Sequence, residues 1–96
     1  MEFNRKDFLV SWKTRVDKEV EIIDKNFDEL NIEKQQIKVQ IGVYQDPSIK
    51  DSFQDEIDKM ITHEKEIIEQ MAILQSESQK QYSLSEIIQR KINKIG

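Results

Sequence analysis

Apolar side chains recur with a seven-residue period through the first half of the chain. One row takes every seventh position, and a second row lies four residues further along. The first row is Leu9, Val16, Ile23, Leu30, Ile37 and Tyr44, and the second is Lys13, Val20, Phe27, Lys34 and Ile41. Two such rows are the d and a positions of a coiled coil. The pattern predicts a helix from about residue 4 to residue 41.

The stretch GVYQDPS interrupts this pattern near the middle of the chain. Gly42 is expected to end the first helix in the left-handed conformation. Helix-start chemistry follows, with Asp46 as a cap before Pro47, or Ser48 as a cap paired with Asp51. These residues predict a turn over 42–47 and a second helix from about residue 48.

The second half continues the two rows, with Phe53, Met60, Ile67 and Leu74 as d and Ile57, Glu64 and Met71 as a. The second helix is therefore expected to reach residue 76 or beyond. Continued further, the a and d rows fall on the polar residues Ser78, Gln81 and Ser85. In addition, Ser83 and Glu86 have the spacing of a capping box, which is typical of a helix start. A break within 76–83, followed by a short helix over about 84–95, is one interpretation. A continuous helix is the other, because neither Gly nor Pro intervenes.

Two long helices joined by a short connection run antiparallel. The predicted fold is all-α: one domain over residues 1–96, folded as an antiparallel two-helix coiled-coil hairpin. In the expected register Val20 lies opposite Leu74 and Phe27 lies near Ile67. A single hairpin of this size has a marginal core, so assembly into a larger helical bundle is expected.

Several large apolar side chains fall outside the a and d rows, which is more than scattered surface exposure explains. We expect another helical chain to cover them, and a homodimer forming a four-helix bundle is the simplest arrangement. The candidate oligomer surface consists of Ile22, Ile32, Val39, Ile61, Ile68 and Ile73; Phe8, Trp12, Val43 and Ile87 also lie off the seam.

The residue inventory offers little catalytic chemistry. There is no Cys, and His63 is the only histidine. His63-Glu64 begins an H-E-x-x-H zinc motif, but Ile67 stands where the second histidine is required. A site using His63 with Glu56 or Glu66 fits helical spacing, although such groups usually form a solvated face. No phosphate loop or nucleophile motif is found. We expect no enzyme activity, no cofactor and no metal site.

Charge is distributed unevenly along the chain. Residues 1–18 carry five basic and three acidic residues, and residues 80–96 carry four and one, whereas residues 19–79 carry six and fifteen. Because an antiparallel hairpin brings its ends together, aromatic and basic residues are expected to share one end. Aromatic residues and Arg are enriched at binding hot spots. The candidate partner-binding residues are Phe8, Trp12, Arg15, Arg90, Lys91 and Lys94.

The sequence therefore predicts a structural or adaptor protein that binds another helical protein or itself. One alternative is a secretion-associated helical protein or export chaperone, although the Trp-x-Gly turn of type VII hairpins is absent because Trp12 lies far from the turn. Another is a small regulator whose basic end contacts nucleic acid, which the net charge of −4 disfavours. Neither a membrane span nor a signal peptide is expected, so the predicted location is cytoplasmic, with leaderless export left open.

Overall fold

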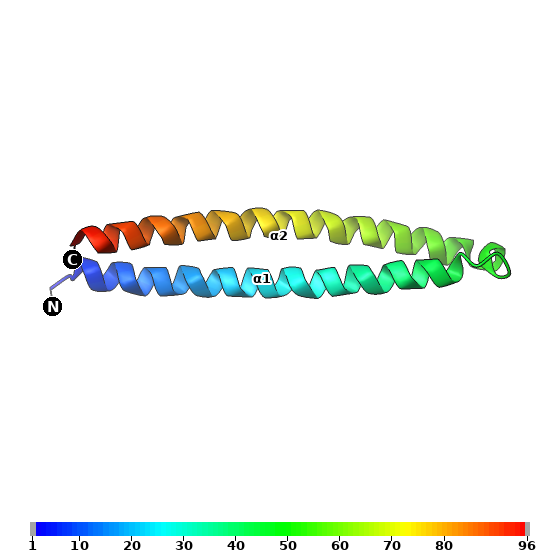
Figure 1. The fold of residues 1–96 in the computed structure, drawn as a ribbon, viewed down its shortest axis with the longest axis horizontal. Helices are drawn as coiled ribbons and strands as arrows, with labels where there is room; N and C mark the ends of the chain where they lie inside the picture. Colours follow the sequence, from blue (N-terminus) through cyan, green and yellow to red (C-terminus); the bar gives the residue numbers. More distant parts are fainter. Residues whose placement is uncertain (1, 96) are drawn as a thin grey trace. The chain divides into compact units, whose positions relative to one another are not determined.

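The computed structural model describes residues 2–95, which form two long α-helices joined by an irregular connection (Figure 1). Helix α1 spans Arg5–Tyr44, the short 3-10 turn η1 spans Lys50–Ser52, and helix α2 spans Gln54–Ile95. The two helices pack against each other, and residues 2–95 contain no strand. The all-α prediction is confirmed. Within this range, neither helix is both long and apolar enough to cross a membrane.

The chain divides into two compact units, and both helices contribute to each. Unit 1 comprises Met1–Lys25 with Leu74–Gly96, and unit 2 comprises Asn26–Ile73. Unit 2 therefore contains the connection between the helices, whereas unit 1 contains the two terminal segments.

Helix α1 has a side-chain cap at its start. The backbone N–H of Asp7 donates to the Asn4 side-chain oxygen at 3.0 Å, which satisfies one of the free donors of the first turn. The predicted start at residue 4 is therefore close to the observed one. None of the eleven residues in the a and d rows of α1 is exposed, because these rows face α2.

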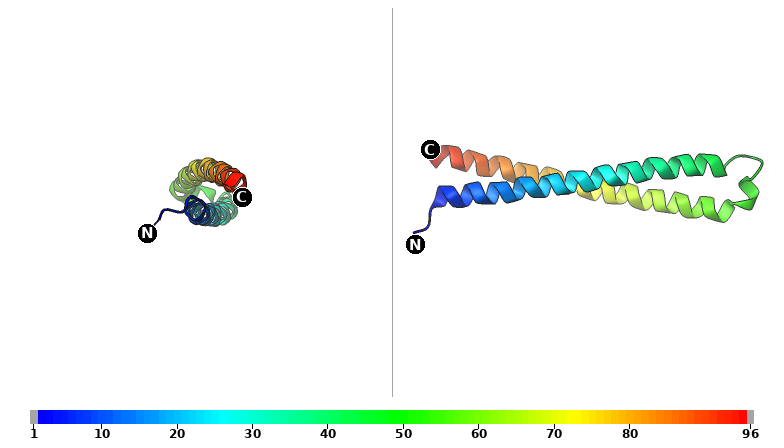
Figure 2. Two further views of the ribbon diagram at one scale, coloured as in Figure 1. Left: turned by 90° about the vertical axis from the view of Figure 1, so that its left-hand side faces the viewer. Right: turned by 90° about the horizontal axis from the view of Figure 1, so that it is seen from below.

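The connection is longer than predicted, and its geometry differs from the expected helix cap. Gly42 lies inside α1, and no described residue has a positive φ, so the prediction that Gly42 ends the helix in a left-handed conformation is wrong. The Asp46 carboxylate instead accepts hydrogen bonds from the backbone N–H and the hydroxyl of Ser48. This Asx-type turn leads into η1 rather than into a helix. The predicted turn over 42–47 thus becomes a connection over 45–53, and α2 begins at Gln54 rather than at about residue 48 (Figure 2).

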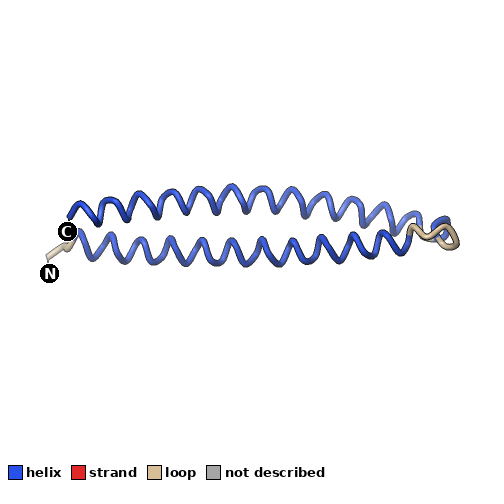
Figure 3. Tube along the Cα trace, in the orientation of Figure 1, coloured by secondary structure: helices blue, strands red, loops and turns tan. Residues whose placement is uncertain are grey.

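Helix α2 is continuous to Ile95, so the interpretation with a break at 76–83 and a separate helix over 84–95 is wrong (Figure 3). The polar stretch remains on the packed side: Ser78 and Gln81 are half-buried and Ser85 is buried. The hydroxyl of Ser78 donates to the Asp24 carboxylate at 2.7 Å, and that of Ser85 donates to Asp17. Because buried hydroxyls need partners, these contacts let polar residues occupy the seam without ending the helix.

Unit 2 has an apolar core. Ile37, Ile67 and Met71 are buried together, and partly buried apolar side chains pack around them: Phe27, Leu30, Ile41 and Met60. At the connection, the rings of Tyr44 and Phe53 lie 4.9 Å apart and cover the end of this core.

In unit 1 the helices are shifted from the predicted register. With Val20 opposite Leu74, Asp17 would lie near residue 77, but it contacts Ser85. Asp24 would lie near residue 70, but it contacts Ser78. The difference is about one heptad. A seven-residue slide keeps the same rows facing each other, so the repeat alone did not distinguish the two registers.

Candidate protein-interaction site

The six residues of the candidate oligomer surface are all exposed, in agreement with their positions outside the seam. Five belong to unit 2 and Ile22 belongs to unit 1. Their exposed fractions run from 46% for Ile68 to 68% for Val39. Branched aliphatic side chains at such exposure leave apolar area in water, at a cost of roughly 25 cal/mol per Å² relative to burial.

Three of the exposed apolar residues form a stripe on α1 in unit 2. Ile32, Val39 and Val43 lie seven and four residues apart, a spacing that keeps them on one side of the helix. Gln36 and Gln40 lie between them, so the stripe carries no charge over two turns. We name Ile32, Val39 and Val43 the aliphatic stripe.

Unit 1 has an aromatic row at the start of α1. The rings of Phe3 and Phe8 lie 5.8 Å apart, and those of Phe8 and Trp12 lie 6.1 Å apart. Phe3 and Phe8 are exposed, whereas Trp12, at 36%, lies at the margin of the packed surface. These contacts hold the three rings together as one surface feature, which we name the aromatic row.

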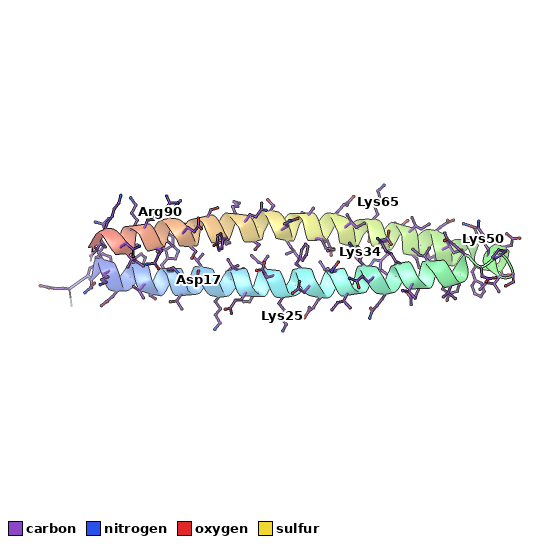
Figure 4. All side chains as sticks on the ribbon, viewed as in Figure 1. Asp17, Lys25, Lys34, Lys50, Lys65 and Arg90 are labelled. Atoms are coloured by element: carbon purple, nitrogen blue, oxygen red, sulfur yellow. The ribbon has the colours of Figure 1, made fainter. Side chains whose placement is uncertain are left out.

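The basic candidates do not all lie beside the aromatic row. Arg15 follows Trp12 by three residues and therefore extends the same side of α1. Arg90 projects from α2 on the side away from α1 (Figure 4). Lys91 and Lys94 are exposed on the last turns of α2 in the same unit. The structure thus separates Arg90 from the aromatic row, because it occupies the outer side of its helix.

A His–Glu cluster ties the two helices together in unit 2. His63 Nε2 lies 2.9 Å from Glu33 Oε1 on the other helix, and its Nδ1 lies 3.8 Å from Glu66 Oε2. The hydrogen bond to Glu33 raises the pKa of His63, and the charge of Glu33 and the contact with Glu66 act in the same direction. Sequence reasoning found Glu66 by helical spacing. It missed Glu33, thirty residues away, because that contact depends on the pairing of the helices.

An open depression lies beside this cluster. It has a volume of about 620 Å³ and is lined by Glu33, Gln36, Ile37, Val39, Gln40 and His63. Val39 of the aliphatic stripe forms part of its wall. Among residues 2–95 no three His, Asp or Glu side chains are arranged to hold a metal ion. The depression therefore combines the aliphatic side chains of Ile37 and Val39 with polar groups, and Glu33, the one acid among its lining residues, already contacts His63.

The polar contacts in unit 1 form a second group of ionisable residues. Asp17 accepts from Lys13 Nζ at 2.7 Å and from the Ser85 hydroxyl. The hydrogen bond from Lys13, with that from Ser85, lowers the pKa of Asp17. Its side chain is nearly half exposed, so this contact is partly screened by water. These groups are already paired within the chain and serve the packing of α1 on α2.

Comparison with known proteins adds no relative: no family model, no curated protein and no solved structure matches this chain. Its function must therefore be argued from the surfaces described above.

Proposed function

We propose that this chain is a non-enzymatic structural or adaptor protein that acts by helix–helix binding to other protein chains, including copies of itself. The observation that carries the proposal is the set of large apolar side chains exposed along both helices. In unit 2 the core is complete within the hairpin, so these residues are surplus to its own packing.

The heptad frame supports the same proposal. Both helices are amphipathic over about forty residues, and a coiled-coil hairpin of this kind assembles readily into a helical bundle. The aliphatic stripe lies outside the a and d rows of α1 that face α2, where a helix of another chain would cover it. A protein partner is favoured over nucleic acid because the net charge of −4 repels phosphate.

Sedimentation velocity across a concentration series tests the proposal. We expect a dimer or larger species at micromolar concentration. Replacing Ile32 and Val39 with Ser should raise the dissociation constant at least tenfold, because burial of each side chain contributes roughly 1.5–3 kcal/mol. The matched control replaces Gln35 and Lys38 with Ser on the same helix. A monomer at all concentrations, or equal loss in the control, would contradict a role for the stripe.

The aromatic row is the second surface for a partner, because Trp and Arg side chains dominate binding hot spots. Trp12→Ala should mainly raise the dissociation rate of a bound partner, whereas Arg15→Glu should mainly slow association. If Trp12 instead only widens the packing of α1 on α2, Trp12→Ala lowers the melting temperature and leaves the kinetics of the folded protein unchanged. Thermal unfolding and binding kinetics on the same protein separate the two roles.

A further inference from the structure

The start of α1 alternates basic and aromatic residues on one of its sides. In the heptad frame, positions c and g lie on one flank of the a and d rows, and positions b and e lie on the other. The first four c and g positions of α1 are Arg5, Phe8, Trp12 and Arg15, and all four side chains are exposed. Their spacing of three and four residues keeps them on one side of the helix. The pattern ends at Glu19, the next g position.

Two lysines of α2 belong to the same flank of unit 1. The opposite flank is marked by Asp17 and Asp24, both at e positions, which bond to serine hydroxyls of α2. In an antiparallel pair the g positions of both helices flank the same side of the seam. Lys91 at g and Lys94 at c therefore share the flank of the aromatic residues. We name the following residues of unit 1 the basic aromatic face: Arg5, Phe8, Trp12, Arg15, Lys91 and Lys94.

The charge of this face is available to a partner. Its four basic side chains make no ion pair with any carboxylate of residues 2–95, whereas Lys13 is already bound to Asp17. The acids of α1 near the face, Asp7 at b and Asp17 at e, lie on the opposite flank, and the stretch 87–95 of α2 carries no acid. A local group of unpaired positive charges attracts an anionic partner.

The aromatic side chains favour a partner that lies alongside the helix. Phe8 and Trp12 are four residues apart, and such pairs form the ridges that pack into the grooves of another helix. Trp12 is only 36% exposed, so most of its ring is covered by its own chain and it does not project far enough to insert into a bilayer. The net charge of −4 also opposes approach to an anionic membrane or to nucleic acid.

We infer that the partner of the basic aromatic face is an acidic amphipathic helix of another protein. Its apolar stripe packs on Phe8 and Trp12, and its flanking Glu or Asp side chains pair with the four basic groups. Arg5 and Arg15 suit this role because a guanidinium forms two parallel hydrogen bonds to one carboxylate. The inference rests on the helix–helix binding proposed above and names the chemistry of the partner at this surface.

Two synthetic helical peptides test the inference. Each has about three heptads and the same stripe of Leu, with Glu beside the stripe in one peptide and Lys in the other. Trp12 is the only tryptophan, so a blue shift of its emission during titration reports that a peptide covers the face. We expect the acidic peptide to bind at least about tenfold more tightly than the basic one, and its Kd to rise with salt concentration.

Charge reversal on the face should abolish this preference. Arg15→Glu with Lys91→Glu should weaken binding of the acidic peptide by at least about tenfold, because like charges then meet. The matched control is Lys18→Glu with Arg90→Glu, which makes the same change of charge at f positions of unit 1. Arg90 projects away from α1 (Figure 4). The control should bind within about threefold of the wild type, since general surface charge contributes little at this range.

A second pair of variants tests the apolar part of the face. Phe8 and Val10 are each 46% exposed, but Val10 is at an e position on the opposite flank. Phe8→Ala should weaken both peptides by at least about fivefold, because an aromatic anchor is lost, whereas Val10→Ala should leave binding unchanged. Circular dichroism checks that every variant keeps its helices.

The outcomes distinguish this inference from the proposed function. A preference for the acidic peptide that only the face variants lose supports the inference. Equal affinity for both peptides, binding of neither, or equal losses in the face variants and their controls overturns it. A blue shift with vesicles of phosphatidylcholine and phosphatidylglycerol, but not with the acidic peptide, assigns the face to membranes and also overturns it.

Self-association is measured separately, by sedimentation velocity of the same proteins. If charge reversal on the face abolishes self-association, the occupant is a second copy of this chain and the inference is overturned. If the wild type self-associates through the aliphatic stripe but binds neither peptide, the inference fails and helix–helix binding stands. A chain that neither self-associates nor binds a peptide overturns both proposals.

Discussion

Inside each of the two units, a different kind of contact joins α1 to α2. In unit 2 most of the facing side chains are apolar, apart from Lys34 and Glu64, and Ile37, Ile67 and Met71 form a buried cluster. In unit 1 the buried apolar residues Val16, Ile23 and Ile88 share the seam with Ser85, whose hydroxyl bonds to Asp17. The same heptad frame therefore accommodates an apolar cluster in one unit and hydrogen-bonded layers in the other.

This difference in contacts affects how strictly the register of the two helices is fixed, as well as how stable their packing is. Apolar burial is non-directional, so the buried cluster of unit 2 does not by itself select one partner for each side chain. The contacts of Ser78 and Ser85 with aspartates require particular partners, and a seven-residue slide would leave these hydroxyls without them. Polar layers of this kind fix the register of paired helices, at some loss of stability. We therefore expect unit 2 to contribute most of the stability and unit 1 to specify the register.

The largest effect should come from the core of unit 2. Ile67→Ala should lower the free energy of unfolding by roughly 2–5 kcal/mol, because Ile67 is 2% exposed and the lost volume leaves a cavity. Its neighbour Ile68 is 46% exposed, and Ile68→Ala should cost less than about 1 kcal/mol. Denaturant unfolding at low protein concentration measures both. Equal losses would show that the apolar core does not dominate this unit.

Phe27 packs against the same cluster as Ile67, so the two sites should be coupled. We expect Phe27→Ala and Ile67→Ala together to differ from the sum of the single changes by roughly 0.5–3 kcal/mol. A double-mutant cycle in denaturant gives this coupling energy. Strict additivity would contradict the shared packing.

An intermediate effect is expected in unit 1. Ser85→Ala removes the hydrogen bond to Asp17 and should cost about 1 kcal/mol at neutral pH. The control is Ser83→Ala, since Ser83 is exposed on the same helix. The lowered pKa of Asp17 means that its contribution is present above the ordinary carboxyl pKa and is lost as pH falls through the folded value. Ser85→Ala should therefore reduce the loss of stability on acidification, and an unchanged acid profile would contradict this.

The class of fold followed from the sequence because it depends on a repeat. The a and d rows from Leu9 to Met71 identified both helices, and the off-seam positions identified the exposed apolar residues. Of the two interpretations of 76–83, the break was wrong and the continuous helix is observed; the break was considered because Ser78 and Ser85 look unfit for a seam when taken alone. Each is satisfied by an aspartate more than fifty residues away, and the sequence does not show that pairing.

For a related reason, the sequence did not predict the geometry of the connection or the contacts between the two helices. Asp46 and Ser48 indicated a turn, but the same residues suit either a helix cap or the Asx turn that is observed. The contact between His63 and Glu33 depends on register, which a heptad repeat leaves undetermined. Local chemistry was therefore predictable, and the pairing of distant residues was not.

A smaller effect of opposite sign should come from Gly42 in unit 2. Gly42 lies within α1 without a positive φ, and a Cβ added there would meet no atom within 4 Å. Gly42→Ala should therefore stabilise the protein by roughly 0.5–1 kcal/mol, because Ala loses less backbone entropy in a helix. Thermal unfolding of the variant measures the gain. A loss of stability would instead indicate that Gly42 needs a left-handed conformation, as the sequence first suggested.

The smallest effect should be the pH dependence that His63 gives to unit 2. Its side chain is half exposed, so water screens its contact with Glu33. The hydrogen bond to Glu33 raises the pKa of His63 above its ordinary value of about 6.5. A raised folded pKa means that the stabilisation is fully present below the ordinary value and is lost as pH rises through the folded one. We therefore expect stability to decline slightly as pH rises above about 6.5, and His63→Gln to remove that decline. Glu33→Gln should flatten the same profile because it removes the charge that favours the protonated ring.

Glu56→Gln is the control, since helical spacing suggested Glu56 as a partner but the contacts of His63 are with Glu33 and Glu66. The measurement is the free energy of unfolding of each variant across this pH range. If Glu56→Gln flattens the profile as much as Glu33→Gln does, then general surface charge, and not the contact between the helices, sets the pH response.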